Sequence, residues 1–379
     1  MPGVSNARMS RVPAILQVLP ALDSGGVERG TLEIAEAIIA AGYRAIVASA
    51  GGRLVPDLEA LGARHMRLPL ATKSPWAIWR NATALAAIAE AEGVRILHAR
   101  SRAPAWSALL AARRNDTHFV TTYHGTYGEG FAGKRLYNSV MARGDRVIAI
   151  SQHIRNHILA RHGDVSGRIR LIPRGVDLRR FDPDRVALER ITALRAGWSL
   201  PDGCPTILLP ARLTRWKGQK VLIEALARMP GVVAVLAGDA QGRESYVREL
   251  HDLAAAHGVA DRIRLPGHVA DMPAALLAAD VVVHASIEAE AFGRTVIEAQ
   301  AMARVVIASD LGGPRETVKD GLTGWLTPPG NAPAMAERIQ QVLAETAEAR
   351  AAMGEAARRS VPTMETMQAA TMDVYRELL

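Results

Sequence analysis

The sequence predicts two consecutive α/β domains, each built on a doubly wound parallel sheet of the Rossmann-like type. Short apolar runs alternate with helical patterns along nearly the whole chain, and this alternation is typical of parallel sheets. The length of 379 residues is sufficient for two hydrophobic cores of ordinary size. A passage rich in Pro and Gly interrupts the alternation, and we therefore expect the domain boundary near residues 176–184.

Each predicted strand is a short apolar run. In the first half of the chain these runs are 14–22, 43–50, 95–99, 118–124 and 145–151, and residues 27–39 have a helical pattern. In the second half they are 205–211, 232–238, 262–267, 281–286 and 305–310. Residues 334–379 are helical in pattern, beginning after Pro333 and broken at Pro362.

These patterns divide the chain into three parts. We expect one Rossmann-like domain in residues 1–180, a second in residues 181–361, and a terminal helix in residues 362–379. Ligands of open parallel sheets bind beyond the carboxyl ends of the strands. Two such domains facing each other would form an interdomain cleft, and that cleft is the expected site.

Composition indicates a folded protein of the cytoplasm. Hydrophobic residues make up 49% of the chain and charged residues 22%, which argues against disorder. The single cysteine gives no sign of an oxidising compartment, and no apolar run reaches the ~18 residues that a membrane span needs. The sequence therefore predicts neither secretion nor membrane insertion.

Positive charge is concentrated in the first half of the chain. Residues 1–200 contain 28 Lys and Arg against 16 Asp and Glu, a net charge of +12, whereas the whole chain carries +8. This excess favours an anionic partner such as a membrane surface, although solvated surface charges would give the same count. The first half has no interleaved aromatic residues or RNA-binding motif, so nucleic acid is not the expected partner.

The strongest candidate site lies in SIEAEAFGRTVIEAQA, which follows a predicted strand. Glu290 falls in the loop before a helix, and Glu298 falls within the helix. The helix begins around Gly293, and its first amide groups and dipole suit a phosphate. The two carboxylates can accept hydrogen bonds from hydroxyl groups of a sugar and a ribose. A capping carboxylate with a solvated helical Glu is the structural alternative.

A second cluster lies in PTILLPARLTRWKGQKVLIEAL, where a predicted strand leads into a basic loop. Arg212, Arg215 and Lys217 precede Gly218, at which the next helix begins. Cations at the carboxyl end of a strand can bind a diphosphate. The spacing is not that of a Walker A loop, and a solvated basic turn is the alternative.

Signals in the first half are weaker. Gly25 and Gly26 permit a tight turn after the first strand, and His124 ends the strand 118–124. The glycines do not form the G-x-G-x-x-G pattern of nicotinamide-dinucleotide enzymes, which argues against an oxidoreductase. His124 can donate a hydrogen bond to a substrate or transfer a proton, but a lone histidine is more often structural.

Two further segments carry charge patterns. Residues 131–146 place apolar side chains at helical spacing beside basic ones, which fits either a helix resting on an anionic bilayer or a core-facing helix. Asp182 and Asp184 form a D-x-D pair, which ligates metal in some enzymes, but they lie in the Pro-rich connector. We interpret them as part of the linker and expect no metal site.

Together these motifs resemble the family 4 retaining glycosyltransferases of the two-domain GT-B fold, especially bacterial enzymes of lipopolysaccharide or other envelope glycans. The resemblance covers nearly the whole chain. Its most specific motifs are EAEAFGRTVIEAQA, ARLTRWKGQKVLIEAL and RGVDLRRFDP, supported by DSGGVE and YHGTY.

The resemblance implies a role for each candidate residue in the second domain, which would bind the nucleotide-sugar donor. Arg212 and Lys217 would hold the donor diphosphate, Glu298 the ribose hydroxyls, and Glu290 the donor sugar near the reacting centre. The remaining donor-binding positions are in the loop and first helical turn, Phe292, Gly293, Arg294 and Thr295.

The first domain would bind the acceptor, a saccharide or glycolipid. His124 would support the donor sugar from the acceptor side, and Gly26 would let its loop approach the donor phosphates. The terminal helix would pack back on this domain. The implied reaction is a metal-independent, retaining hexosyl transfer without a cofactor, in the cytoplasm or on the inner face of the plasma membrane. A nucleotide-sugar epimerase of the same fold and a non-catalytic nucleotide-sugar-binding module are the alternatives.

Overall fold

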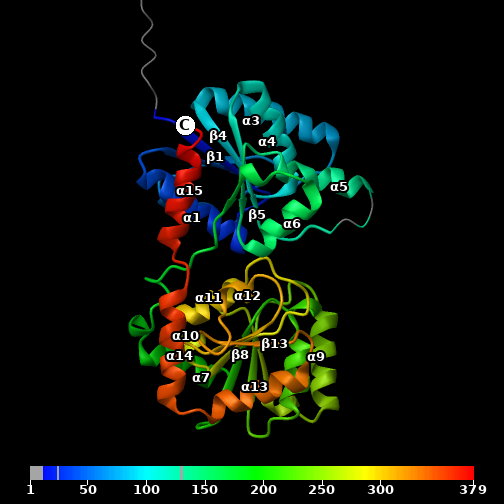
Figure 1. Ribbon diagram of the computed structural model, residues 1–379, viewed down its shortest axis with the longest axis vertical. Coiled ribbons are helices and arrows are strands. Elements are labelled where there is room, and N and C mark those ends of the chain that lie inside the picture. Colours follow the sequence, from blue (N-terminus) through cyan, green and yellow to red (C-terminus); the bar gives the residue numbers. More distant parts are fainter. Residues whose placement is uncertain (1–11, 24, 129, 131) are drawn as a thin grey trace, which may run out of the picture. The chain divides into compact units, whose positions relative to one another are not determined.

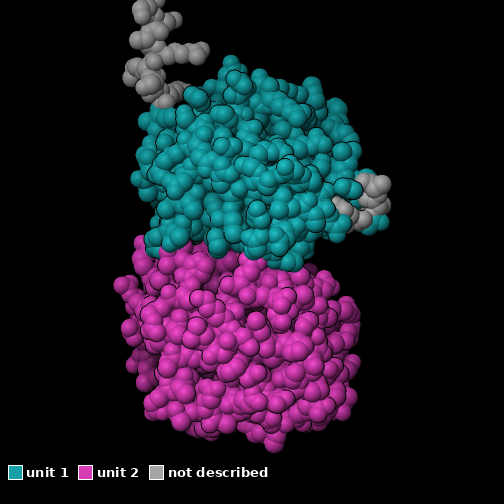
Figure 2. Space-filling model, viewed as in Figure 1, with its two compact units in different colours: residues 1–173, 365–379 teal, residues 174–364 magenta. Residues whose placement is uncertain are grey.

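The computed structural model describes residues 12–379 apart from Ser24, Glu129 and Phe131. The chain divides into two units (Figure 2). Unit 1 comprises the N-terminal part up to Pro173 together with Glu365–Leu379, and unit 2 comprises Arg174–Met364. The division between Pro173 and Arg174 lies a few residues before the passage at which the sequence places the boundary.

Unit 1 contains a parallel sheet with the strand order β3-β2-β1-β4-β5-β6-β7, of which β1, β4 and β5 are labelled in Figure 1. The strands are β1 Ala14–Val18, β2 Arg44–Ser49, β3 Arg64–Arg67, β4 Val94–Ala99, β5 His118–Tyr123, β6 Arg146–Ala149 and β7 Ile169–Leu171. The helices between them are α1 Gly26–Ala40, α2 Val55–Ala60, α3 Pro75–Glu92, α4 Arg102–Asn115, α5 Ala132–Ser139 and α6 Gln152–His162. The order reverses between β1 and β4, which are adjacent in the sheet but distant in sequence.

Unit 2 repeats this plan with the strand order β10-β9-β8-β11-β12-β13, again all parallel. The strands are β8 Thr206–Pro210, β9 Val233–Ala237, β10 Ile263–Gly267, β11 Val281–His284, β12 Val306–Ser309 and β13 Trp325–Thr327. The helices are α7 Leu188–Gly197, α8 Gln219–Leu226, α9 Glu244–Ala256, α10 Met272–Leu277, α11 Arg294–Ala301, α12 Pro314–Thr317, α13 Ala332–Ala344 and α14 Ala347–Ser360. Here the order reverses between β8 and β11.

The two units confirm the predicted fold class, two doubly wound α/β domains. Every predicted strand is present. All of them except the edge strand β10 are central strands, which are buried on both faces of a covered parallel sheet and so form apolar runs. Three strands, β3, β7 and β13, were not predicted from the sequence. All three lie at sheet edges, where a strand has one neighbour and needs less apolar sequence.

The core of unit 2 on one face of its sheet is formed by α8, α9 and α13. Alternate residues of β8, Ile207 and Leu209, pack into this cluster beside Leu222, Tyr246 and Ile339, and all five are almost completely buried. This packing fixes the sheet, and with it the loops at the carboxyl ends of β8 and β11.

The terminal helix α15, Met364–Arg376, belongs mostly to unit 1. The hydroxyl of Tyr375 lies 2.6 Å from Nδ1 of His98 on β4, and Nε2 of His98 lies 2.7 Å from the hydroxyl of Thr122 on β5. These three side chains are buried, so His98 is a structural residue that connects the end of the chain to the sheet. The helical pattern of residues 334–379 is divided into three helices, with a break at Glu345 in addition to the one at Pro362.

Candidate functional site

The basic loop after β8 is fixed by a close approach to β11. Gly218 has a φ of +74°, and a Cβ atom at this position would lie 1.9 Å from the carbonyl oxygen of Ala285. Only glycine fits such a gap in this conformation. The loop therefore passes directly against the end of β11 and carries Lys217 there on a short 3₁₀ turn, Arg215–Lys217.

The acidic loop after β11 is held from two sides. The amide of Ile287 donates to the carbonyl of Trp216 at 2.8 Å, which ties this loop to the basic one. The amide of Gly313 donates to the carbonyl of Glu290 at 2.8 Å, which ties it to the loop after β12. The backbone around Glu290 is thus fixed between two neighbouring loops, and this determines where its side chain points.

The carboxylate of Glu290 is the centre of a polar cluster. It forms an ion pair with Lys217, lies 2.6 Å from Nε2 of His284, and accepts a hydrogen bond of 2.5 Å from the hydroxyl of Ser286. The side chains of Glu290 and Lys217 are each only 12% exposed. All three partners come from β8, β11 or the loops at their carboxyl ends, at the point where the strand order of unit 2 reverses.

The environment keeps Glu290 ionised. Burial alone would raise the pKa of its carboxyl group, but the charges and hydrogen bonds of His284 and Lys217 outweigh burial and hold the pKa well below its ordinary value. An ionised carboxylate accepts hydrogen bonds and attracts positive charge. It is therefore suited to orienting sugar hydroxyls or stabilising a cationic centre, and not to donating a proton.

His284 and Ser286 were not singled out in the sequence. His284 is 5% exposed, and among the described residues its Nδ1 atom has no hydrogen-bond partner. The available signal was a polar side chain at the end of the buried run VVVHAS, where an apolar residue would otherwise be expected. A buried histidine beside an ionised carboxylate is a further candidate for the site.

The helix predicted after the acidic loop is α11, and it begins where expected. Gly293 is its N-cap with a φ of +86°, and Phe292 before it is buried. In the first turn Arg294 forms an ion pair with Glu298, with 3.6 Å between Nε and Oε1. Thr295 is partly exposed beside them. The structure therefore joins Arg294 to Glu298, a contact that the sequence alone did not indicate.

The cations of the basic loop differ in their surroundings. Arg212 is exposed, and its carbonyl accepts a hydrogen bond of 2.9 Å from the side chain of Gln219. Arg215 forms an ion pair with Glu249 on α9, which directs it away from the cluster. Lys217 is the cation that contacts Glu290, and Arg212 is an exposed charge on the same loop.

The candidates of the first half, Gly26 and His124, belong to unit 1. Gly26 is the first residue of α1, after the N-cap Gly25, and His124 directly follows β5. The backbone amide of His124 hydrogen-bonds to the hydroxyl of Tyr127. Both candidates thus lie at carboxyl ends of strands, β1 and β5, as the sequence predicts.

The two remaining segments are residues 131–146 and the connector that contains Asp182 and Asp184. Val140 and Met141 are fully buried, so they are unavailable to a bilayer, whereas Leu136 on α5 is exposed; Phe131 lies outside the described residues. Asp182 forms ion pairs with Arg185 and Arg358 and lies in the connector. In the part of the chain that the structure describes, no three His, Cys, Asp or Glu side chains gather as a metal site would require.

Comparison with protein families gives two matches that together span most of the chain. A model described as Glycosyltransferase Family 4 matches residues 24–180, and a model described as Glycosyl transferases group 1 matches residues 191–360. The first covers most of unit 1 and the second most of unit 2.

Among solved structures, the chain is similar to a glycosyltransferase from Rickettsia africae ESF-5, with 35% identity, a TM-score of 0.90 and coverage of 97% of this chain and 98% of that one. It is also similar to Anabaena Alr3699/HepE in complex with UDP and glucose, with 25% identity, a TM-score of 0.84 and coverage of 96% and 100%.

Among curated proteins, the chain is similar to the lipopolysaccharide core biosynthesis glycosyltransferase LpsE of Rhizobium meliloti strain 1021, with 32% identity over 191 residues. This stretch is 50% of the present chain and 54% of LpsE, and the chain spans about half the length of the curated relatives it matches.

Proposed function

Because this chain belongs to the family 4 glycosyltransferases of the GT-B fold, we propose that it transfers a sugar from a nucleotide-sugar donor to a lipid-linked or saccharide acceptor. The observation that carries the proposal is the cluster of Lys217, Glu290 and His284 at the reversal of strand order in unit 2. The ammonium group of Lys217 suits the anionic diphosphate of a nucleotide sugar, and the ionised carboxylate of Glu290 suits the hydroxyl groups of its sugar. The Anabaena relative was solved with UDP and glucose, which supports a nucleotide sugar as the ligand.

In the proposed donor complex, the phosphates displace the carboxylate of Glu290 from the ammonium group of Lys217. Lys217 and the exposed Arg212 then hold the diphosphate, together with the amides at the start of α11 around Phe292, Gly293, Arg294 and Thr295. Glu290 is released to the donor sugar, and Glu298 accepts hydrogen bonds from the ribose. Gly26 and His124 belong to unit 1, and their roles toward the donor remain predictions from the sequence.

We propose that the transfer retains the anomeric configuration and needs no metal. The bond between the anomeric carbon and the diphosphate oxygen breaks, and its electrons leave with the diphosphate. The acceptor oxygen forms its bond on the same face of the sugar, and its proton passes to the departing phosphate oxygen. Lys217 and Arg212 stabilise the negative charge on the leaving group, and ionised Glu290 positions the sugar and stabilises positive charge on it.

A panel of UDP, GDP and ADP sugars tests the donor. The donor that raises the melting temperature is then incubated with saccharide acceptors in the presence of EDTA, and NMR reports the anomeric configuration of the product. Transfer with retained configuration is the expected result. An epimerised donor without any acceptor would favour the epimerase, and ligand binding without turnover would favour the binding module; the matched families and relatives favour neither.

We further propose that the acceptor belongs to lipopolysaccharide or other envelope glycan synthesis, as the name of the Rhizobium relative suggests, and that unit 1 contacts an anionic membrane on the cytoplasmic side. On α3, Trp76 and Trp79 are 65% and 56% exposed, and Arg80 and Arg114 stack on them. Exposed tryptophan beside arginine suits the headgroup region of an anionic bilayer. No helix among the described residues has the length and apolarity to span a membrane.

Sedimentation with vesicles tests this surface. Trp76→Ala with Trp79→Ala is expected to reduce binding to vesicles containing phosphatidylserine, and salt is expected to weaken binding of the unaltered chain. Leu188→Ala, which removes an exposed apolar side chain from unit 2, is the matched control. Equal sedimentation of the tryptophan variant and the control would refute a membrane role for α3.

A further inference from the structure

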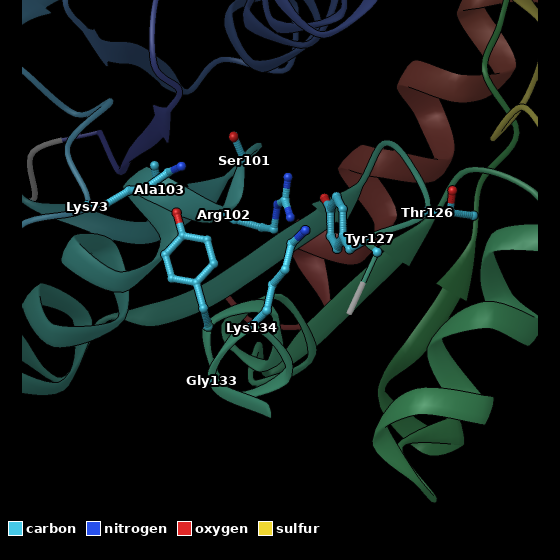
Figure 3. A pocket seen from close by; sticks show the side chains of 10 residues that line it. Lys73, Ser101, Arg102, Ala103, Thr126, Tyr127, Gly133 and Lys134 are labelled. Carbon is cyan, nitrogen blue, oxygen red and sulfur yellow. The ribbon is translucent and has the colours of Figure 1, made fainter. Parts of the chain in front are cut away.

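A cavity of about 700 Å³ lies in unit 1, apart from the cluster around Glu290. It is lined by residues that follow three strands and by α5 (Figure 3). Lys73 comes from the loop between β3 and α3, Arg102 from the start of α4 after β4, and Tyr127 from the loop after β5. Lys134 comes from α5. The cavity thus opens at the carboxyl ends of strands, where open parallel sheets bind ligands, and its volume suits a small ligand.

Three cations, Lys73, Arg102 and Lys134, line the cavity, and the other lining residues that the structure describes are neutral. None of the three cations forms an ion pair with a carboxylate in the described part of the chain. Nζ of Lys134 lies 4.0 Å from the position that a Cβ atom on Gly128 would take, so the charge of Lys134 is at the wall of the cavity. In Figure 3, Lys134 extends from α5 toward the guanidinium group of Arg102. Like charges gathered without a counter-charge attract an anion.

Arg102 is held in position by neutral groups, which leaves part of its guanidinium group available to a ligand. Its Cζ atom lies 4.1 Å from the ring centre of Tyr127, and its Nη1 donates to Oδ1 of Asn138 at 2.9 Å. Asn138 is buried and in turn donates to the carbonyl of Gly128 at 3.3 Å. A guanidinium group that is fixed in this way loses little freedom when it binds an anion.

Neutral donors surround the cations. Burial raises the pKa of Tyr127 to about 12, with partial opposition from Arg102, and burial also raises the pKa of Tyr137. Both phenols therefore keep their protons at neutral pH and can donate hydrogen bonds. Ser101 is the N-cap of α4, but its side chain accepts no capping hydrogen bond, so its hydroxyl is available to the cavity.

We propose that this cavity binds a phosphate group of the acceptor, so that the acceptor is a phosphorylated saccharide, either free in solution or attached to a lipid carrier through a diphosphate. The proposal rests on the proposed function, since it assigns the acceptor of the same reaction. A phosphate carries nearly two negative charges and three acceptor oxygens, which match several cations and neutral donors better than a single carboxylate or an uncharged sugar does.

The test compares the full chain with Lys73→Gln/Lys134→Gln. These two side chains make no hydrogen bond or ion pair in the described part of the chain, so their removal is expected to leave folding unchanged. Arg135→Gln is the matched control, because Arg135 lies on the same helix, is exposed and does not line the cavity. Calorimetry measures binding of inorganic phosphate and pyrophosphate. Sedimentation measures binding to phosphatidylcholine vesicles with a polyprenyl diphosphate, with phosphatidylserine vesicles as the control for general charge.

The double variant is expected to bind the phosphate probes more weakly by on the order of tenfold to a hundredfold, and the control variant as the unaltered chain does. Binding of the soluble probes without preference for the diphosphate vesicles assigns a free sugar phosphate. A preference for diphosphate over phosphatidylserine vesicles, lost in the double variant, assigns a lipid-linked acceptor. Equal binding of every probe by the double variant and the unaltered chain overturns the proposal.

Thermal stabilisation by the donor nucleotide separates this proposal from the proposed function. The double variant is expected to keep that stabilisation, because neither Lys73 nor Lys134 is among the proposed donor-binding residues, and Lys217, Glu290 and the start of α11 lie in unit 2. If no nucleotide sugar stabilises or reacts with the unaltered chain, the glycosyltransferase function and the acceptor assignment both fail, even where Lys73 and Lys134 still bind phosphate.

Discussion

Replacement of Lys217 by methionine tests the centre of the site. Methionine keeps an unbranched apolar side chain, which preserves packing on Trp216, and removes the charge that contacts Glu290. His284 and Ser286 still hydrogen-bond to the Glu290 carboxylate in the variant. The change therefore removes one charge from a buried cluster without leaving the carboxylate isolated.

The expected magnitudes follow from this geometry. Removing one partner of a fully buried ion pair costs about 3 to 5 kcal/mol of folding stability. Because His284 and Ser286 remain, we expect a loss of about 1 to 3 kcal/mol, the scale of a hydrogen bond to a charged group. In catalysis, the loss of one preorganised charge on the leaving diphosphate costs about 2 to 4 kcal/mol, which lowers the rate of sugar transfer roughly 30-fold to 1,000-fold.

Sugar-transfer assays and denaturant unfolding measure both effects. Lys220→Met is the matched control. Nζ of Lys220 on α8 lies 3.0 Å from a carboxylate oxygen of Glu249 on α9, and exposed ion pairs of this kind contribute less than about 1 kcal/mol to stability. A double-mutant cycle with Glu290→Gln measures the coupling between Lys217 and Glu290. The reasoning is refuted if the losses of unfolding free energy in the two single variants sum to the loss in the double variant within about 0.5 kcal/mol. A near-normal rate of sugar transfer by Lys217→Met would refute it as well.

Three other predictions follow from the structure. Because the fold lowers the pKa of Glu290, its ionised carboxylate contributes stability at pH values above the ordinary glutamate pKa of 4.5, and this contribution decreases as the pH falls below 4.5. The difference in unfolding free energy between the unaltered chain and Glu290→Gln is thus expected to be constant near neutral pH and to shrink in acid; a difference independent of pH contradicts this. Tyr375→Phe leaves the buried His98 without its partner on α15, so urea unfolding is expected to show a loss of about 1 to 3 kcal/mol, and an unchanged midpoint would show that the contact is dispensable. Gly218→Ala is expected to destabilise unit 2 and reduce sugar transfer much more than Gly231→Ala, since the two glycines have nearly equal positive φ but only the first lacks space for a Cβ atom; equal losses in melting temperature would contradict the close approach.

The sequence was sufficient for the fold class because the central strands are nearly continuous apolar runs. The strands β8 and β11 are examples, since each is buried on both faces and leads into a polar loop. The edge strand β3 reads RHMR and has no such run, so its place in the sheet depends on pairing with β2 and not on its own composition. The close approach at Gly218 could not be predicted either, because it depends on the carbonyl group of Ala285, which follows β11 and is distant in sequence.

For the site, the sequence determined the chemical groups and their positions at strand ends: Lys217 after one strand, Glu290 after another, and a helix beginning at Gly293. Only the tertiary structure decided that these groups meet. β8 and β11 are separated in sequence by β9 and β10, and they become neighbours because β9 and β10 extend the sheet in the other direction. The adjacency of β8 and β11 brings Lys217 to the carboxylate, whereas His284 and Ser286 reach it because the loop after β11 folds back on the end of its own strand. These contacts hold the carboxylate ionised, since a pKa depends on burial and on nearby charges that distance along the chain does not reveal.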